Sequence, residues 1–239
     1  MQIDNHTAKM DGLQYVSNIY PIYQKGNVKL INADCMEIMA QYPNKYFDLA
    51  VVDPIYGHDL SGGHNSKNGC GDKTFWNKAV NEWNTKKTQP EYFKELFRVS
   101  KNQIIWGGNN FTLEGTEGFI IWDKGQRNFS LADAELAWTS YQKATRIFSF
   151  SRAKNNKNIR THPTEKPIEL YDFCFNYAKA TKDMKVLDTH GGSFSSAIAG
   201  YYFGFSEFVA CELNTEMYQL SVKRFKEKTL SQLINFDCC

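Results

Sequence analysis

Residues 53–56 combine the groups that could activate an aromatic amine. Asp53, Pro54 and Tyr56 directly follow the apolar run 47–52. The nitrogen of an aromatic amine is a poor nucleophile because its lone pair is delocalised into the ring. The Asp53 carboxylate and the Pro54 carbonyl could accept its N–H bonds, while the Tyr56 ring stacks on the substrate. Asp-Pro after a strand is also a common structural turn, so these residues alone do not decide the chemistry.

A second group of candidate residues lies late in the chain. An apolar run ends at Asp188, Gly191 and Gly192 follow, and the next apolar run ends at Glu212. Glycines let a backbone approach a ligand closely, and a helix start offers free N–H groups. An acid at the tip of the next strand can accept hydrogen bonds from two ribose hydroxyls. The pattern is typical of a nucleotide-type site, although a plain structural turn would use the same glycines.

The elements that must position these residues alternate between apolar strands and amphipathic helices. This alternation predicts an α/β fold with a mostly parallel sheet. Strands are expected at 28–33, 47–52, 103–106, 119–122, 135–138, 146–150, 185–187 and 207–211. Helices are expected at 36–41, 90–100, 167–180, 193–203 and 215–228. We expect residues 1–25 to be a polar, poorly ordered lead-in, residues 26–230 a single domain, and residues 231–239 a tail.

Composition narrows the class of protein. The chain has 239 residues, of which 42% are hydrophobic and 23% charged, as in ordinary globular domains. A net charge of +2 does not by itself mark a nucleic-acid binder. No run of about 18 apolar residues exists, so we expect no membrane span. The six cysteines show no metal-type spacing, nor do the histidines, which predicts free thiols in a reducing cytoplasm and no metal site.

Four motifs together resemble one enzyme family. Residues 53–56 resemble the DPPY tetrad of amino-methylating DNA methyltransferases, and residues 162–167 resemble their HPTxKP motif. Asp188 with its glycines is similar to their cofactor motif, and Glu212 to their ribose-binding acid. The catalytic motif comes first, as in the permuted beta group, and the resemblance covers roughly residues 28–228. It implies a Rossmann-like S-adenosylmethionine (SAM)-dependent methyltransferase fold with helices on both faces of the sheet.

The resemblance also implies a role for individual residues. Asp53, Pro54 and Tyr56 would hold the target amine and its base. The cofactor contacts it implies are Asp34, His162, Thr164, Lys166, Asp188, His190, Gly191, Gly192, Ser193 and Glu212. Among these, His162, Thr164 and Lys166 would line the methionine end of SAM, and Asp34 would lie near its adenine. Two positions depart from the family pattern, since Ile55 replaces a usual proline and Phe194 replaces a usual glycine.

DNA is the partner that the resemblance implies. The expected contacts to DNA are basic residues, namely Lys73, Lys143, Arg146, Arg152, Lys154, Lys157 and Arg160. Most stand where bases greatly outnumber acids, although a solvated loop would have the same composition. Segments 57–90 and 151–162 are the expected recognition loops. We expect no membrane partner and either a monomer or a homodimer; a cognate restriction endonuclease is a further partner that such enzymes can have.

Several functions remain open at this point. Asp at position 53 favours adenine N6 as the target, whereas cytosine-N4 enzymes more often carry Ser there and glutamine-methylating enzymes Asn. A DNA-binding module without catalytic activity is the alternative of another class, and Ile55 and Phe194 motivate it. A nicotinamide dehydrogenase would share the fold but would leave residues 53–56 and 162–167 without a role.

Overall fold

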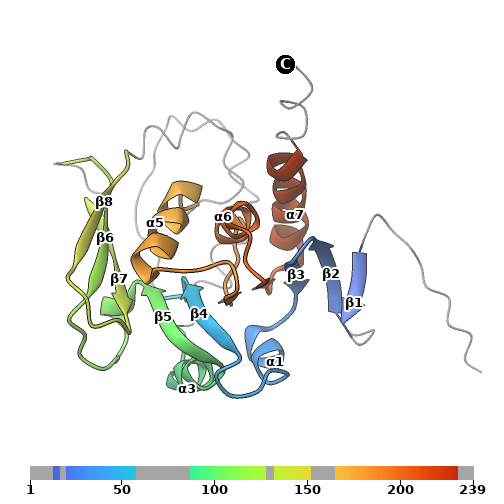
Figure 1. Ribbon diagram of the computed structural model, residues 1–239, viewed down its shortest axis with the longest axis horizontal. Helices are drawn as coiled ribbons and strands as arrows, with labels where there is room; N and C mark the ends of the chain where they lie inside the picture. Colours follow the sequence, from blue (N-terminus) through green and yellow to red (C-terminus); the bar gives the residue numbers. More distant parts are fainter. Residues whose placement is uncertain (1–12, 17–19, 58–86, 128–131, 152–164, 231–239) are drawn as a thin grey trace, which may run out of the picture.

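A single mixed sheet forms the centre of the molecule in the computed structural model (Figure 1). The structure describes residues 13–16, 20–57, 87–127, 132–151 and 165–230. From one edge of the sheet to the other, the strands are β1 (Leu13–Val16), β2 (Tyr20–Lys25), β3 (Val28–Asn32), β10 (Glu207–Glu212), β9 (Lys185–Asp188), β4 (Phe47–Val52), β5 (Ser100–Trp106), β7 (Ala134–Thr139), β6 (Phe119–Asp123) and β8 (Arg146–Ser149). The predicted α/β fold is confirmed.

The five central strands of the sheet are parallel. They run in the order β3-β10-β9-β4-β5, and β7 then inserts antiparallel between β5 and β6. Strands β9 and β10 come from the last third of the chain, yet they fill the place between β3 and β4. The strands that end at Asp188 and Glu212 therefore lie between strands made earlier in the chain.

Helices cover both faces of the sheet. On one face lie α5 (Ile168–Ala178), α6 (Ser195–Phe203) and α7 (Thr215–Leu230), and on the other lie α1 (Cys35–Met39) and α3 (Pro90–Val99) (Figure 1). A short 3-10 turn, η1 (Gly108–Asn110), follows β5. None of the helices in the described ranges is both long and apolar enough to cross a membrane.

The burial of β4 explains its apolar run from Leu49 to Val52. Leu49 and Val51 pack into the core on the α5–α7 side, whereas Ala50 and Val52 pack into the core on the α1–α3 side. Successive side chains of a strand point to opposite faces, so residues 49–52, which are covered on both faces, are all apolar. Burying each of its Val and Leu side chains contributes about 1.5–3 kcal/mol.

Residues 1–25 were expected to be a poorly ordered lead-in, and this prediction is wrong where the structure describes them, at residues 13–16 and 20–25. Strands β1 and β2 extend the sheet beyond β3 as antiparallel neighbours. Ile22 of β2 is buried and pairs with Ile31 of β3. Strand β2 was not predicted because it lies near the edge of the sheet and buries only Ile22 fully, so its sequence contains no apolar run. Partnership with β3 rather than local sequence makes this segment a strand.

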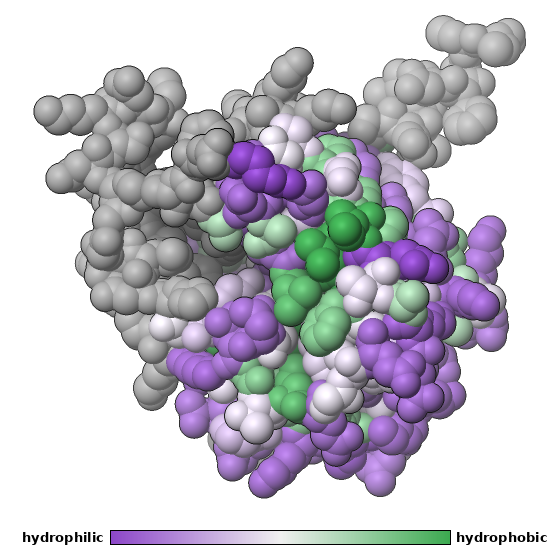
Figure 2. All heavy atoms as spheres, turned by 90° about the vertical axis from the view of Figure 1, so that its left-hand side faces the viewer, coloured by the Kyte–Doolittle hydropathy of each residue, from purple (hydrophilic) through white to green (hydrophobic). Residues whose placement is uncertain are grey.

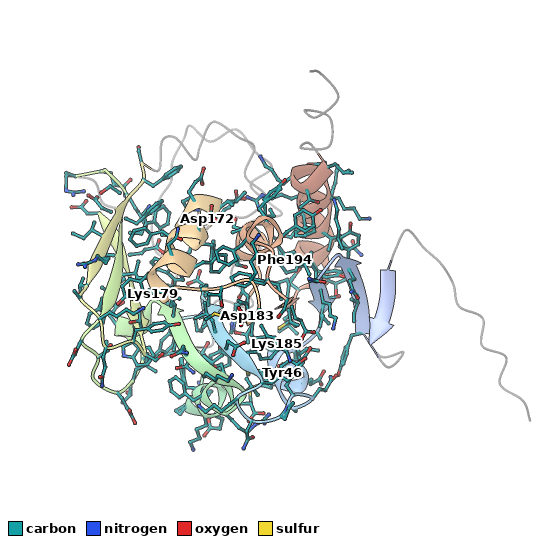
Figure 3. All side chains as sticks on the ribbon, viewed as in Figure 1. Tyr46, Asp172, Lys179, Asp183, Lys185 and Phe194 are labelled. Carbon is teal, nitrogen blue, oxygen red and sulfur yellow. The ribbon has the colours of Figure 1, made fainter. Side chains whose placement is uncertain are left out.

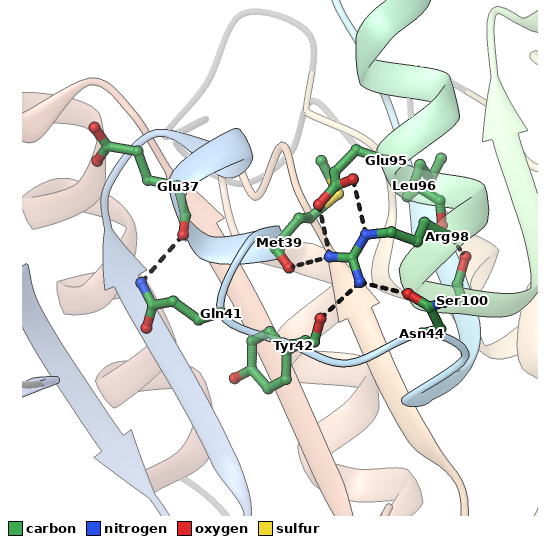
Figure 4. A network of polar contacts seen from close by, with 9 residues as sticks. All are labelled: Glu37, Met39, Gln41, Tyr42, Asn44, Glu95, Leu96, Arg98 and Ser100. Carbon is green, nitrogen blue, oxygen red and sulfur yellow. Dashed lines mark hydrogen bonds and ion pairs between the residues drawn. The ribbon is translucent and has the colours of Figure 1, made fainter.

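Arg98 joins the two helices beneath the sheet. Its guanidinium donates to both Glu95 carboxylate oxygens, to the Asn44 side chain, and to the backbone carbonyls of Met39 and Tyr42 (Figure 4). These bonds occupy the planar fork of donors that arginine presents. They tie the end of α3 to the segment between α1 and β4. Since Arg98 is thereby saturated, its role is to fix the approach to β4.

Candidate active site

Four acids stand at the carboxyl ends of four neighbouring parallel strands. Asp34 follows β3, Glu212 ends β10, Asp188 ends β9 and Asp53 follows β4. The chain leaves β9 through α6 toward β10, and it leaves β4 through α3 toward β5, in the opposite direction. Strand order therefore reverses between β9 and β4, which is where open α/β sheets bind ligands. The catalytic turn and the glycine loop predicted from the sequence flank this point.

Both carboxylate oxygens of Asp53 are engaged. The Tyr56 hydroxyl donates to Oδ1 at 2.8 Å, and the Lys166 ammonium pairs with Oδ2. The side chain of Asp53 is 21% exposed, so it remains accessible from solvent. The carbonyl of Ile55 accepts two bonds from Thr88, one from its N–H at 2.9 Å and one from its hydroxyl at 3.0 Å. These bonds hold the turn at Ile55.

Tyr56 is fixed by packing as well as by its hydroxyl. Gly107 follows β5 with a φ of +64°, and a Cβ added there would lie 2.3 Å from Cε1 of the Tyr56 ring. The Phe111 ring meets the Tyr56 ring edge-on, with 6.3 Å between centroids. Burial and the neighbouring Asp53 charge raise the pKa of Tyr56, so its hydroxyl stays protonated and can donate. A glycine at position 107 therefore makes room for the ring of the catalytic turn.

Lys166 lies against the catalytic turn. Its ammonium contacts Asp53 and lies 3.2 Å from Oε2 of Glu135. The ammonium also lies 5.6 Å from the centre of the Trp106 ring at the end of β5. Burial lowers the pKa of Lys166, but the two carboxylates outweigh burial and hold it well above its usual value. No role was predicted for Glu135, although residues 134–138 and 122–124 resemble stretches of small phage-type adenine methyltransferases.

Asp188 shapes the loop that follows β9. It is buried, accepts a bond from the His190 N–H at 3.0 Å, and receives the Ser196 hydroxyl on its other oxygen. Burial is the main cause that raises its pKa to about 7, and the charges of Asp53 and Glu212 act in the same direction. The carboxylate therefore ties the loop to the start of α6.

Glu212 and Asp34 face the same edge from the neighbouring strands. Glu212 accepts the N–H of Gly192 at 3.0 Å and that of Asn214 at 2.8 Å. A carboxylate offers about four acceptor positions, so these two bonds leave Glu212 able to accept more. Burial raises the pKa of Glu212. Asp34 caps the first turn of α1 by accepting the Met36 N–H at 2.7 Å.

His190 is neutral at physiological pH and belongs to a hydroxyl chain. Its Nδ1 lies 2.9 Å from the Thr189 hydroxyl, which in turn lies 2.5 Å from the Tyr92 hydroxyl. Desolvation lowers the pKa of His190 to about 4. In the parts of the chain that the structure describes, no three His, Cys, Asp or Glu side chains group so as to hold a metal ion, and Cys35, Cys174 and Cys211 are free thiols.

Phe194, the unusual residue of the loop, belongs to the core. It has a φ of +55° at the N-terminus of α6, the backbone conformation that a glycine adopts readily (Figure 3). Its buried ring occupies the space beside Gly191, where an added Cβ would lie 2.2 Å from Cε1 of the ring. The ring also meets Tyr218 of α7 edge-on. Phe194 thus keeps the shape of the loop while its ring points away from the loop surface into the core.

Arg224 of α7 links the cofactor-type loop to the segment that carries Lys166. Its guanidinium donates to the Ser193 carbonyl at 2.8 Å and to Glu165 Oε1 at 2.9 Å. Both partners of the ion pair are about nine-tenths buried. Ser193 itself is buried beside Ser195, with 3.1 Å between the hydroxyl oxygens. The loop after β9 and the approach to α5 are therefore fixed to each other.

Two of the predicted DNA contacts fall within the described residues. Lys143 donates to the Tyr177 carbonyl at 2.8 Å and lies over the Tyr141 ring, so its ammonium is engaged inside the protein. Arg146 is exposed on β8. Figure 2 faces the side of the molecule on which β8 lies, and the surface there mixes hydrophobic with hydrophilic residues. The other predicted DNA contacts lie outside the described part of the chain: Lys73, Arg152, Lys154, Lys157 and Arg160. The predicted cofactor contacts His162 and Thr164 lie outside it as well.

Solved structures with the same architecture identify the fold. PvuII DNA methyltransferase, which is cytosine-N4-specific, superposes with a TM-score of 0.53 at 14% identity, over 87% of this chain and 92% of that one. The chain has the fold of a DNA methyltransferase. M1.HpyAVI in complex with SAM matches 82% of this chain and 99% of its own, with a TM-score of 0.50 and 20% identity. A second M1.HpyAVI structure gives a TM-score of 0.51 at 17% identity, over 82% of this chain and 98% of that one. No protein-family model matches the chain, and neither does any curated protein sequence.

Proposed function

We propose that this protein transfers a methyl group from SAM to the exocyclic amine of a DNA base, with adenine N6 as the first candidate. One observation carries the proposal: the Asp53 turn and the Asp188–Glu212 cofactor-type region flank the point where strand order reverses. Solved structures with this fold include a DNA methyltransferase and a protein bound to SAM, which supports the same class here.

The acids along the sheet edge fit the charge of SAM. When bound, SAM supplies an electrophilic methyl group on a positively charged sulfonium, and it carries a second positive charge on its ammonium. Glu212, with acceptor capacity left, would hold the ribose hydroxyls, and Asp34 would lie at the adenine end. The loop residues His190, Gly191, Gly192 and Ser193 would line the methionine portion, and Asp188 would hold that loop in shape. His162 and Thr164 remain predicted contacts.

Asp53 would activate the amine. Its Oδ1 now accepts the Tyr56 hydroxyl, and an incoming N–H donor could take the same position. The nitrogen lone pair then forms the new N–C bond as the C–S bond breaks, and the C–S electron pair stays on sulfur. The extra proton on nitrogen leaves to water afterwards, so no base needs to remove it first. The Pro54 carbonyl would accept the second N–H bond, and the Tyr56 ring would stack on the base.

Adenine and cytosine both present an exocyclic amine that this geometry could take. Asp at position 53 favours adenine, because the family resemblance associates Asp with adenine enzymes. Cytosine N4 is the second candidate, since a solved structure with this fold is cytosine-N4-specific. Mass spectrometry of nucleosides from treated DNA separates N6-methyladenine from N4-methylcytosine in one measurement.

DNA would approach the carboxyl edge of the sheet. We propose residues 26–230 as one catalytic domain, with segments 57–90 and 151–162 as recognition loops and Arg146 as an exposed phosphate contact. Replacing Arg152, Lys154 and Lys157 with alanine should weaken DNA binding and reduce its salt dependence, because each lost phosphate contact lowers the number of released counterions. An unchanged salt dependence would remove this segment from the DNA interface.

The Asp53→Asn variant tests the enzyme proposal. Asparagine keeps the size of the side chain but removes the charge that faces the amine, so we expect the rate to fall by about 100-fold or more. The matched control is Asp133→Asn. It removes an exposed acid in the connection just before β7 and should keep the wild-type rate. Calorimetric titration with SAM is measured in parallel. A wild-type protein that binds no SAM and methylates neither base would overturn the proposal in favour of a module without catalytic activity.

A further inference from the structure

A row of alternating charges leads to the catalytic turn. The Lys124 ammonium, just after β6, lies 2.7 Å from Oε1 of Glu135 on β7. Oε2 of Glu135 lies 3.2 Å from the Lys166 ammonium, which also pairs with Oδ2 of Asp53. Strand β5 separates the strands of Glu135 and Asp53, so the Lys166 side chain connects them across its end. The row joins the antiparallel extension of the sheet to the candidate active site.

Because Lys166 is buried, its charge must be balanced by nearby carboxylates. The side chain of Lys166 is only 3% exposed, and a buried ammonium is costly unless carboxylates surround it. Burial raises the pKa of Glu135, but Lys166 and Lys124 more than offset this and lower it to about 2. The pKa of Lys166 is likewise held well above its usual value by Asp53 and Glu135, against the effect of burial. Glu135 and Lys166 therefore stay charged at neutral pH.

Sharing Lys166 between two carboxylates changes what Asp53 can do. In a lone pair Lys166 would act on Asp53 alone, whereas here Glu135 draws on the same ammonium; with Lys124 the row of four charges is neutral overall. The amine nitrogen becomes positive as it forms the bond to the methyl group. Fixed negative charge aimed at a developing positive charge lowers the barrier, because it needs no reorganisation during the reaction. Oδ1 of Asp53, which Lys166 does not contact, is the oxygen left for the amine.

We propose that Glu135 is a positioning residue: it holds the Lys166 ammonium between two carboxylates, so that Asp53 keeps its orientation and turns the oxygen that Lys166 does not contact toward the target amine. Lys124 fixes Glu135 from the other side. This inference rests on the proposed methyl transfer. It gives a function to Glu135 of β7 and to Lys124, which follows β6.

Glu135→Gln is the informative variant, because it removes the charge and keeps the shape. We expect kcat to fall by about 10- to 100-fold while KM for SAM changes by less than about 2-fold, since the lost interaction acts on the transition state. Asp133→Asn, two residues earlier, removes the same charge from an exposed side chain and should leave both constants unchanged. Rates are normalised to the number of SAM-binding sites measured by titration, so that unfolded protein does not lower kcat.

Glu135→Asp restores the charge on a shorter side chain, and its kcat should lie between those of the wild type and Glu135→Gln. Wild-type kcat per SAM-binding site in Glu135→Gln would overturn the positioning role. If Glu135→Gln does not fold, Glu135→Asp carries the test, and an unchanged kcat per site in that variant overturns the proposal. A wild-type protein inactive on adenine and on cytosine would refute the proposed function itself, and the role of Glu135 would fall with it.

Discussion

Gly107 offers a sharp test of how the catalytic turn is built. Its φ of +64° is a conformation that costs an alanine about 1–2 kcal/mol. The added Cβ would also lie 2.3 Å from Cε1 of Tyr56, so the ring must shift, and such overpacking costs a further 1–3 kcal/mol, roughly. Gly107→Ala should therefore lower the free energy of unfolding by about 2–5 kcal/mol in total.

Gly125 is the matched control for this prediction. Its φ of +61° is nearly the same, but a Cβ added there would meet only Ser151 atoms at an ordinary 3.7 Å. Gly125→Ala should therefore cost only the backbone term of about 1–2 kcal/mol. Urea unfolding of both variants, together with methylation rates, gives the comparison. Since the added Cβ would displace the Tyr56 ring, which would stack on the target base, only Gly107→Ala should also lose activity. Equal destabilisation and equal activity in the two variants would refute the packing of Tyr56 against Gly107.

Two further predictions concern the loop after β9. Phe194→Gly and Phe194→Ala both lose a buried ring, but only glycine relieves the positive φ, so the glycine variant should be more stable than the alanine variant by about 1 kcal/mol. This is the reverse of the usual order of the two residues. Thermal unfolding of the pair measures the difference, and a less stable glycine variant would contradict the prediction. The pKa of Asp188 is raised to about 7 in the folded protein, so its ionisation opposes folding, and wild-type stability should fall relative to Asp188→Asn as pH rises from about 4 to 7, by up to roughly 4 kcal/mol. Urea unfolding at pH 5 and pH 8 checks the sign, and a constant difference between the two proteins would count against a buried, protonated Asp188.

The sequence was a good guide where elements are buried on both faces. Strand β4 was predicted with its observed bounds, because helices cover it on both sides and all of its residues except Asp48 are apolar. The start of α6 was predicted two residues early, since no local pattern shows that Phe194 adopts a left-handed conformation. Strand β2 was missed because its pairing with β3, not its own composition, makes it a strand.

Only the site residues that belong to local sequence motifs could be predicted. Asp53, Asp188 and Glu212 follow apolar strands, so their common edge could be expected from the parallel sheet. The contact of Lys166 with Asp53 could not, because it joins residues that stand 113 positions apart. Glu135 was invisible for the same reason. An acid in an apolar strand shows that a buried partner exists, but the partner is known only when the sheet order is known.

The order of strands also has a consequence for biosynthesis. Strands β3 and β4 leave the ribosome early, but the strands that fill the place between them, β9 and β10, are made last. Until then the nascent chain holds two exposed strand edges, which readily pair with other chains. Pairings between such distant segments close slowly, because a long loop must be ordered first. We therefore expect the part of the chain before β9, residues 1–184, to be protease-sensitive during synthesis, and resistance to appear only once α7 has emerged.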